Sequence, residues 1–219
     1  PLRVEPTCDR YMPCGRCPLM HLNDEGRTQA QQKILRAPLL EAGISSPGLE
    51  WVSGEEWNSL HSLELMAGYS DQGSIRIGVS AADGREVLPI PLCHLVTPGL
   101  RELMKTLAHH LREKDIRPFD GTGGTLKRIR AFQAPQSKEI LVVLGTARKN
   151  HVLKELCLTV GAALPEIASI WAHNEEEDPQ GEDLWLAYGK KYVEWEAAGL
   201  RLKAGPLDPF PAHPVLEER

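Results

Sequence analysis

Residues 8–18 read CDRYMPCGRCP and place three thiols in the spacing C-x5-C-x2-C. The stretch also holds two prolines, one glycine and two arginines, so it offers little apolar surface to bury. Something other than a hydrophobic core must order such a loop, and thiolates are ligands of iron–sulfur clusters and zinc. The stretch therefore predicts a metal centre that uses Cys8, Cys14 and Cys17.

A site of four thiolates needs one more cysteine, and the chain has five in total. Cys157 shares an apolar helical stripe with Leu156 and Val160, which predicts a small core residue. Cys93 follows a short predicted strand, precedes a predicted helix and lies on no such stripe. We therefore expect Cys93 to be the fourth ligand.

The spacing also bears on which metal is bound. Structural zinc usually pairs two close cysteine knuckles, whereas this chain has one such pair and a distant single cysteine. Three close thiols plus one favour a 4Fe–4S cluster, with zinc as the alternative. The predicted cofactor is a 4Fe–4S cluster whose metal ligands are Cys8, Cys14, Cys17 and Cys93.

Composition sets the broad class of protein. The chain has 219 residues and is 42% hydrophobic, which is enough for a sizeable core. No apolar run reaches the length of a membrane span, so no membrane partner is predicted. An odd number of cysteines, three of them close together, favours metal binding plus one free thiol over disulfides. We therefore expect a reducing, cytoplasmic setting.

Charge is unevenly distributed along the chain. The net charge is −5, yet residues 98–154 are rich in lysine and arginine and residues 155–219 are acidic. The acidic total argues against strong nonspecific binding of nucleic acid, whereas the basic middle is compatible with a local phosphate-facing surface. The candidate RNA contacts are Lys127, Arg128 and Arg130 on a predicted strand; the alternative is a solvated surface.

The pattern of apolar residues predicts an α+β fold, with mixed or antiparallel sheets, packed helices and an N-terminal cysteine-rich cluster loop. Pro38 is expected to kink or split the first helix, and Thr97 to cap the second. Residues 174–183 are expected to form an exposed acidic loop. The predicted helices cover residues 28–43, 98–117 and 148–160, and the predicted strands cover residues 60–69, 75–79, 87–90, 126–132, 139–144, 167–171, 184–188, 192–196 and 200–203.

The cysteine loop and its flanks resemble a known family. The pattern Val4-Glu5-Pro6-x-Cys8-x5-Cys14-Gly15-x-Cys17-x3-His21-Leu22 is similar to the N-terminal cluster loop of the RNA uridine-5-methyltransferases. These S-adenosylmethionine-dependent enzymes make 5-methyluridine in ribosomal or transfer RNA. The run from Arg76 to Ser80, followed by Val87-x-Pro89-Ile90-x-x-Cys93, resembles the family's strand pair that leads to its fourth cluster cysteine.

Further along, the similarity implies the front half of such an enzyme. Arg128-Ile129-Arg130, the strand from Ile140 to Leu144 and the segment 184–202 resemble the family's central domain. The resemblance implies three parts: an iron–sulfur loop and helix over 1–45, a central, RNA-facing α/β domain over 46–204, and an irregular tail over 205–219. The catalytic methyltransferase domain is expected to be absent, so no catalytic residue and no S-adenosylmethionine site are predicted in this chain.

The chain also departs from the family pattern. Where the family motif has a functional glutamine and an asparagine, this chain has Pro211 and His213. Where the family has an arginine-rich, RNA-facing strand, residues 59–62 contain no arginine. These departures weaken the implied RNA contact at that strand.

The function predicted from these observations is a 4Fe–4S protein that lacks methyltransferase activity of its own and binds RNA weakly or a protein partner. One alternative is a truncated fragment of an active S-adenosylmethionine-dependent RNA (uracil-5-)-methyltransferase. Another is a redox or cluster-sensing protein, because Arg10 and Arg16 beside the close cysteine pair could tune a cluster.

Overall fold

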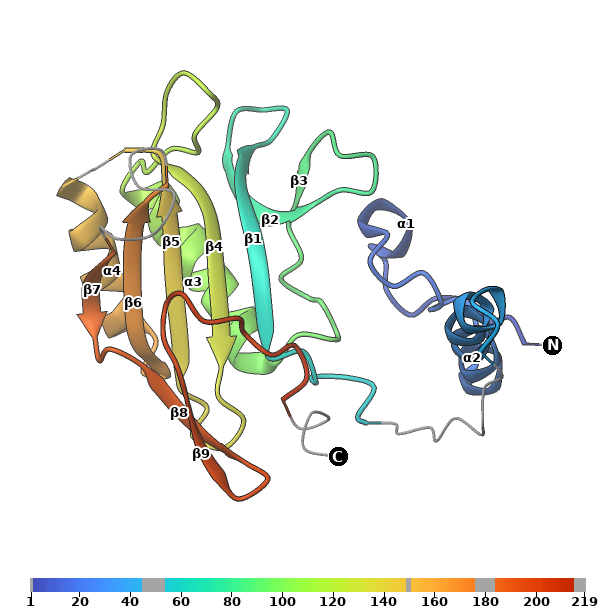
Figure 1. The fold of residues 1–219 in the computed structure, drawn as a ribbon. Coiled ribbons are helices and arrows are strands. Elements are labelled where there is room, and N and C mark those ends of the chain that lie inside the picture. The colour runs from blue at the N-terminus through green and yellow to red at the C-terminus, as the bar shows by residue number, and fades with distance from the viewer. Residues whose placement is uncertain (1, 45–53, 149–150, 176–183, 215–219) are drawn as a thin grey trace.

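The computed structural model describes residues 2–44, 54–148, 151–175 and 184–214 (Figure 1). Its helices are α1 (Tyr11–Cys14), α2 (Asp24–Glu41), α3 (Pro98–Glu113) and α4 (His151–Ala163). Its strands are β1 (Ser62–Tyr69), β2 (Ile75–Ser80), β3 (Val87–Leu88), β4 (Leu126–Gln133), β5 (Ile140–Thr146), β6 (Ile167–Asn174), β7 (Trp185–Gly189), β8 (Val193–Ala197) and β9 (Leu200–Ala204). This arrangement confirms the predicted α+β class.

Seven of the strands form one mixed sheet in the order β3-β2-β1-β4-β5-β6-β7. All neighbours are antiparallel except β5 and β6, which run parallel and are joined through α4. A parallel pair needs such a crossover because its second strand must begin at the same end of the sheet as the first. The short strand β3 lies at the edge, and the loop that carries Cys93 follows it directly.

The main core lies between the sheet and helices α3 and α4 (Figure 1). The leucine stripe of α3 is fully buried, as its helical spacing predicts. Cys157 on α4 is 1% exposed, so its predicted role as a small core residue is confirmed. Burial raises the pKa of the Cys157 thiol to about 12, which keeps it protonated and unreactive at neutral pH.

The opposite face of the sheet is partly covered by the β8–β9 hairpin and by the segment that follows it. Phe132 of β4 lies 5.0 Å from the ring of Trp195 and 5.6 Å from the ring of Phe210, measured between centroids. The backbone carbonyl of Ala212 accepts a hydrogen bond from the amide of His61. Residues 205–214 are irregular, as predicted, but they pack on the sheet instead of extending away from it.

The structure differs from three local predictions in detail. Helix α2 begins at Asp24, not Thr28, because the Asn23 side chain caps it by accepting a hydrogen bond from Gly26 N at 2.9 Å. Pro38 lies inside α2 instead of splitting it. Thr97 precedes α3 at the cap position, yet its side chain makes no capping hydrogen bond.

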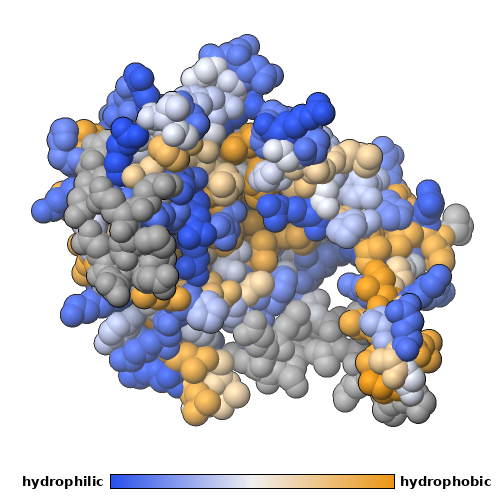
Figure 2. All heavy atoms as spheres, turned by 45° about the horizontal axis from the view of Figure 1, so that its top comes forward, coloured by the Kyte–Doolittle hydropathy of each residue, from blue (hydrophilic) through white to orange (hydrophobic). Residues whose placement is uncertain are grey.

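The second half of α2 has apolar side chains at the surface. Ile34 is 62% exposed and Leu40 is 65% exposed, because this helix stands away from the sheet (Figures 1 and 2). The apolar side chains of this part of α2 are therefore not part of the core.

Two further expectations concern the acidic loop and the membrane. Asn174 lies at the buried end of β6, not in an exposed loop, whereas residues 176–183 lie outside the described part of the chain. Within the described ranges, every helix is too short or too polar to cross a bilayer.

Candidate functional site

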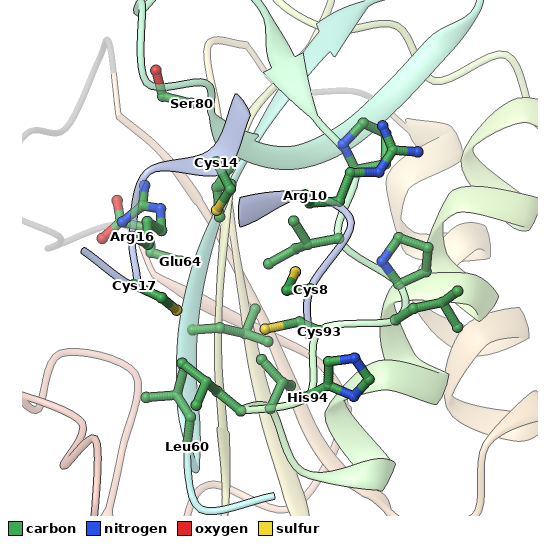
Figure 3. Close-up of a pocket in the computed structure, with 18 of the residues that line it drawn as sticks. Cys8, Arg10, Cys14, Arg16, Cys17, Leu60, Glu64, Ser80, Cys93 and His94 are labelled. Atoms are coloured by element: carbon green, nitrogen blue, oxygen red, sulfur yellow. The ribbon is translucent and has the colours of Figure 1, made fainter. Parts of the chain in front are cut away.

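Four cysteines line one cavity of about 710 Å³ between the N-terminal loop and the edge of the sheet. Cys8, Cys14 and Cys17 come from the segment around α1, and Cys93 comes from the loop after β3. Figure 3 shows their sulfur atoms directed into the same space. All four side chains are partly buried. The structure therefore brings together the four cysteines that the sequence singled out.

The cysteine loop is shaped by a single helical turn. The amide of Gly15 donates to the carbonyl of Tyr11 at 3.0 Å and ends α1 in the left-handed conformation, with φ of 67°. A Cβ atom at Gly15 would lie only 2.9 Å from the Cβ of Ala82, so glycine suits the position for two reasons. The close contact between Gly15 and Ala82 of the β2–β3 hairpin thus lies between Cys14 and Cys17 in the chain.

Two hydrogen bonds fix this loop further. The amide of Ala82, in the β2–β3 hairpin, donates to the carbonyl of Pro13 at 2.8 Å. The Tyr11 hydroxyl lies 2.9 Å from Nδ1 of His21, within hydrogen-bonding distance. A segment with little apolar surface is in this way attached to the sheet edge next to Cys93.

The thiols influence one another electrostatically. The pKa of Cys17 is raised, first by burial and then by the neighbouring Cys93, Cys14 and Cys8. Mutual repulsion of this kind is what a bound cation relieves, because metal ligands bind as thiolates. The arrangement therefore has the donor chemistry of a soft-metal site.

The sulfur atoms are nevertheless spread apart. Among the described residues, His109, His110 and Glu113 near the end of α3 form a group of potential metal ligands. Their donor atoms all lie within 4.8 Å of one another. No three of the cysteines form such a group. A tetrahedral zinc with Zn–S bonds of about 2.3 Å would bring its sulfurs to about 3.8 Å. In every set of three of these cysteines, at least one pair of sulfurs is therefore farther apart than around a single zinc ion.

The three candidate RNA-contact residues on β4 have partners within the chain. Arg128 pairs with Glu175, and with Glu64 at 3.2 Å, while Lys127 lies 3.9 Å from Glu175. Arg130 differs from both because its partners are the backbone carbonyls of the tail and the ring of Phe210, 4.6 Å away. The structure does not gather these cations into one open patch, and its acidic side chains offset part of their charge.

The sequence interpretation missed Phe210 at the site and named Arg130 only as a candidate RNA contact. Arg130 and Phe210 line the same cavity as the cysteines, although they come from β4 and from the tail. An aromatic residue in a proline-rich tail gave no periodic signal, and only the fold brings it to the cavity. Arg101, a residue of α3 that no motif singled out, donates a hydrogen bond to the backbone of Cys93.

No family model matches this chain, whereas several known proteins are similar to it. An uncharacterized RNA methyltransferase of Enterococcus faecalis is 25% identical over 203 residues, which cover 88% of this chain and 44% of that protein. A 23S rRNA (uracil(1939)-C(5))-methyltransferase RlmD of Shewanella sediminis is 32% identical over 163 residues, which cover 68% of this chain and 36% of that protein.

A solved structure has the same fold. The tRNA (uracil-54, C5)-methyltransferase of Pyrococcus abyssi, in complex with S-adenosyl-L-homocysteine, matches with a TM-score of 0.70 and 20% identity, covering 97% of this chain and 48% of that one. That compound belongs to the neighbour's complex, and the expected lack of a methyl-donor site in this chain stays a prediction. The chain spans about half the length of these relatives or less, and it is similar to RNA methyltransferases, among them enzymes that act on C5 of uracil.

Proposed function

We propose that this chain is a 4Fe–4S-binding counterpart of the front half of RNA uridine-5-methyltransferases, which binds RNA and transfers no methyl group by itself. The observation that carries the proposal is the convergence of Cys8, Cys14, Cys17 and Cys93 on one cavity. The similarity to RNA methyltransferases supports the RNA part. The proposed parts are a cluster loop and helix over 1–45, a central domain over 46–204 and a packed tail from 205.

The spacing of the sulfurs supports a cluster over a single zinc ion. In a 4Fe–4S cluster each thiolate binds a different iron, so the sulfurs stand farther apart than around one metal ion. A bound cluster would link the N-terminal loop to the sheet edge through four covalent bonds. That link stabilises a loop which has one backbone hydrogen bond, from Ala82 to Pro13, to the β2–β3 hairpin. We therefore assign the cluster a structural role.

Metal analysis tests the cluster. Protein purified without oxygen is expected to be brown and to contain about four irons per chain, with a matching amount of acid-labile sulfide. Zinc should be measured on the same sample. A colourless chain that holds one zinc ion and no sulfide would contradict the proposal.

RNA binding is expected to be weak. Arg130 is the cation on β4 whose recorded partners are carbonyl groups and a ring instead of carboxylates, so we propose it as the main contact. With acidic side chains beside Lys127 and Arg128, about three or four phosphate contacts are expected, which gives a micromolar Kd that rises steeply with salt.

Fluorescence anisotropy with a structured, uridine-containing RNA measures this affinity. Arg130→Gln should weaken binding several-fold, whereas Arg201→Gln, an equal charge change at an exposed position of β9, should not. In the same samples, labelled S-adenosylmethionine should leave the RNA unlabelled. Absence of binding at low salt refutes the RNA module, and robust labelling refutes the lack of methyl transfer.

A further inference from the structure

The loop that carries Cys93 is held by an arginine from α3. Nη1 of Arg101 donates to the backbone carbonyl of Cys93 at 3.1 Å and to that of Val96 at 2.5 Å. The same nitrogen donates to Oδ1 of Asn58 at 2.8 Å. One side-chain nitrogen thus joins both ends of the Cys93 loop to the segment that precedes β1.

These contacts close a small backbone assembly. The amide of Asn58 donates to the carbonyl of His94 at 2.8 Å, and the amide of Leu60 donates to that of Leu95 at 2.8 Å. Asn58 adopts a left-handed conformation with φ of 56°, which turns its side chain and its amide toward the same loop. The Cys93 loop is therefore paired with residues 58–60 along its length, and Arg101 fixes its two ends.

The arginine itself stands on a rigid support. Its neighbours on α3, Leu100 and Leu103, are 0% exposed and packed in the main core. A planar guanidinium also offers its donors in a fixed geometry, so less freedom is lost when the bonds form. The Cys93 loop is therefore attached to the core through Arg101 and α3, as well as to the edge strand β3.

We propose that Arg101 is a positioning residue, which holds Cys93 where the cluster requires its sulfur. The inference rests on the proposed cluster and goes beyond it, because it names a residue outside the four ligands. Partners that orient metal ligands typically change metal affinity by about 10- to 100-fold when they are removed.

The test compares variants of the full chain loaded with a cluster under anaerobic conditions. Arg101→Gln is expected to release iron to a chelator about 10- to 100-fold faster than the unchanged protein. Arg101→Lys, which keeps the charge but places its nitrogen differently, should lie between the two. Arg112→Gln is the matched control, because Arg112 is an exposed residue of the same helix whose side chain donates to Ala108.

A spectroscopic readout separates positioning from general loss of stability. The electron paramagnetic resonance spectrum of the reduced cluster should change in Arg101→Gln and stay unchanged in Arg112→Gln. If Arg101→Gln does not fold, Asn58→Gly removes one of the acceptors and still allows the left-handed conformation; it should give an intermediate rate of iron release.

The outcomes distinguish this inference from the proposed function. If the chain without substitutions takes up no iron, both the proposed cluster and the role of Arg101 are overturned. If the chain binds a cluster but Arg101→Gln changes neither the rate of iron release nor the spectrum, only the role of Arg101 is overturned. If Asn58→Gly has to be used instead, iron release at the rate of the unsubstituted chain would likewise overturn the role of Arg101.

Discussion

Replacing Cys93 with alanine is expected to lower the iron content from about four to less than about one per chain. The other three thiols lie within residues 8–17, so this change removes the ligand that links the cluster loop to the sheet edge. We expect three ligands on a loop with little buried apolar surface to hold a cluster too weakly to resist oxidation and chelators. Iron and sulfide analysis, together with visible absorption, measures the effect.

Cys157→Ala is the matched control for this experiment, since it removes a thiol of the same size from the core. The expected cost is a small cavity of about 1–2 kcal/mol in unfolding free energy, with iron content unchanged. Loss of the cluster in Cys157→Ala, with Cys93→Ala unaffected, would reverse the assignment of the fourth ligand.

Replacing Gly78 with alanine is expected to reduce the free energy of unfolding by about 3 kcal/mol or more. A Cβ atom at this position of β2 would lie 2.1 Å from the carbonyl oxygen of Leu88 and 2.4 Å from its carbon. Those are backbone atoms of the neighbouring chain segment, so a side-chain movement cannot relieve the contact. The strand β3 has to shift, and Cys93 follows it.

The change at Gly78 should therefore also lower cluster content. Urea unfolding of the apo chain measures the first effect and iron analysis the second. Gly123→Ala provides the comparison, because the nearest heavy atom to its Cβ would be 3.9 Å away. Equal stability of the two variants would show that β3 can move freely and that it does not fix the position of Cys93.

Regular spacing made most of the fold predictable. The leucines of α3 recur at helical intervals and proved to be fully buried, and Cys157 could be assigned to the core from the same kind of pattern. Residues typical of turns, Asp71-Gln72-Gly73 and Asp83-Gly84, lie between β1 and β2 and between β2 and β3, where the structure has hairpins. These features depend on neighbours within a few residues, which a sequence displays directly.

Contacts between distant segments could not be predicted in this way. Arg128 meets Glu175, and Arg101 meets Asn58, only because the sheet and the loops bring them together. A cationic residue on a strand or helix looks the same in the sequence whether it faces solvent or an internal carbonyl. For that reason the cysteines could be singled out from spacing, while the role of Arg101 and the partners of Lys127 and Arg130 required the structure.

The separation of the four cysteines along the chain determines when a cluster can be inserted during folding. Three thiols are available as soon as the N-terminal loop is made, but Cys93 reaches them only after β3 has paired with β2. That edge is anchored through β1 to β4, whose residues come more than thirty positions after Cys93. Closing such a long loop before the sheet exists is entropically unfavourable. If the proposed cluster forms, we therefore expect its insertion to follow the pairing of β3 with β2 and of β1 with β4.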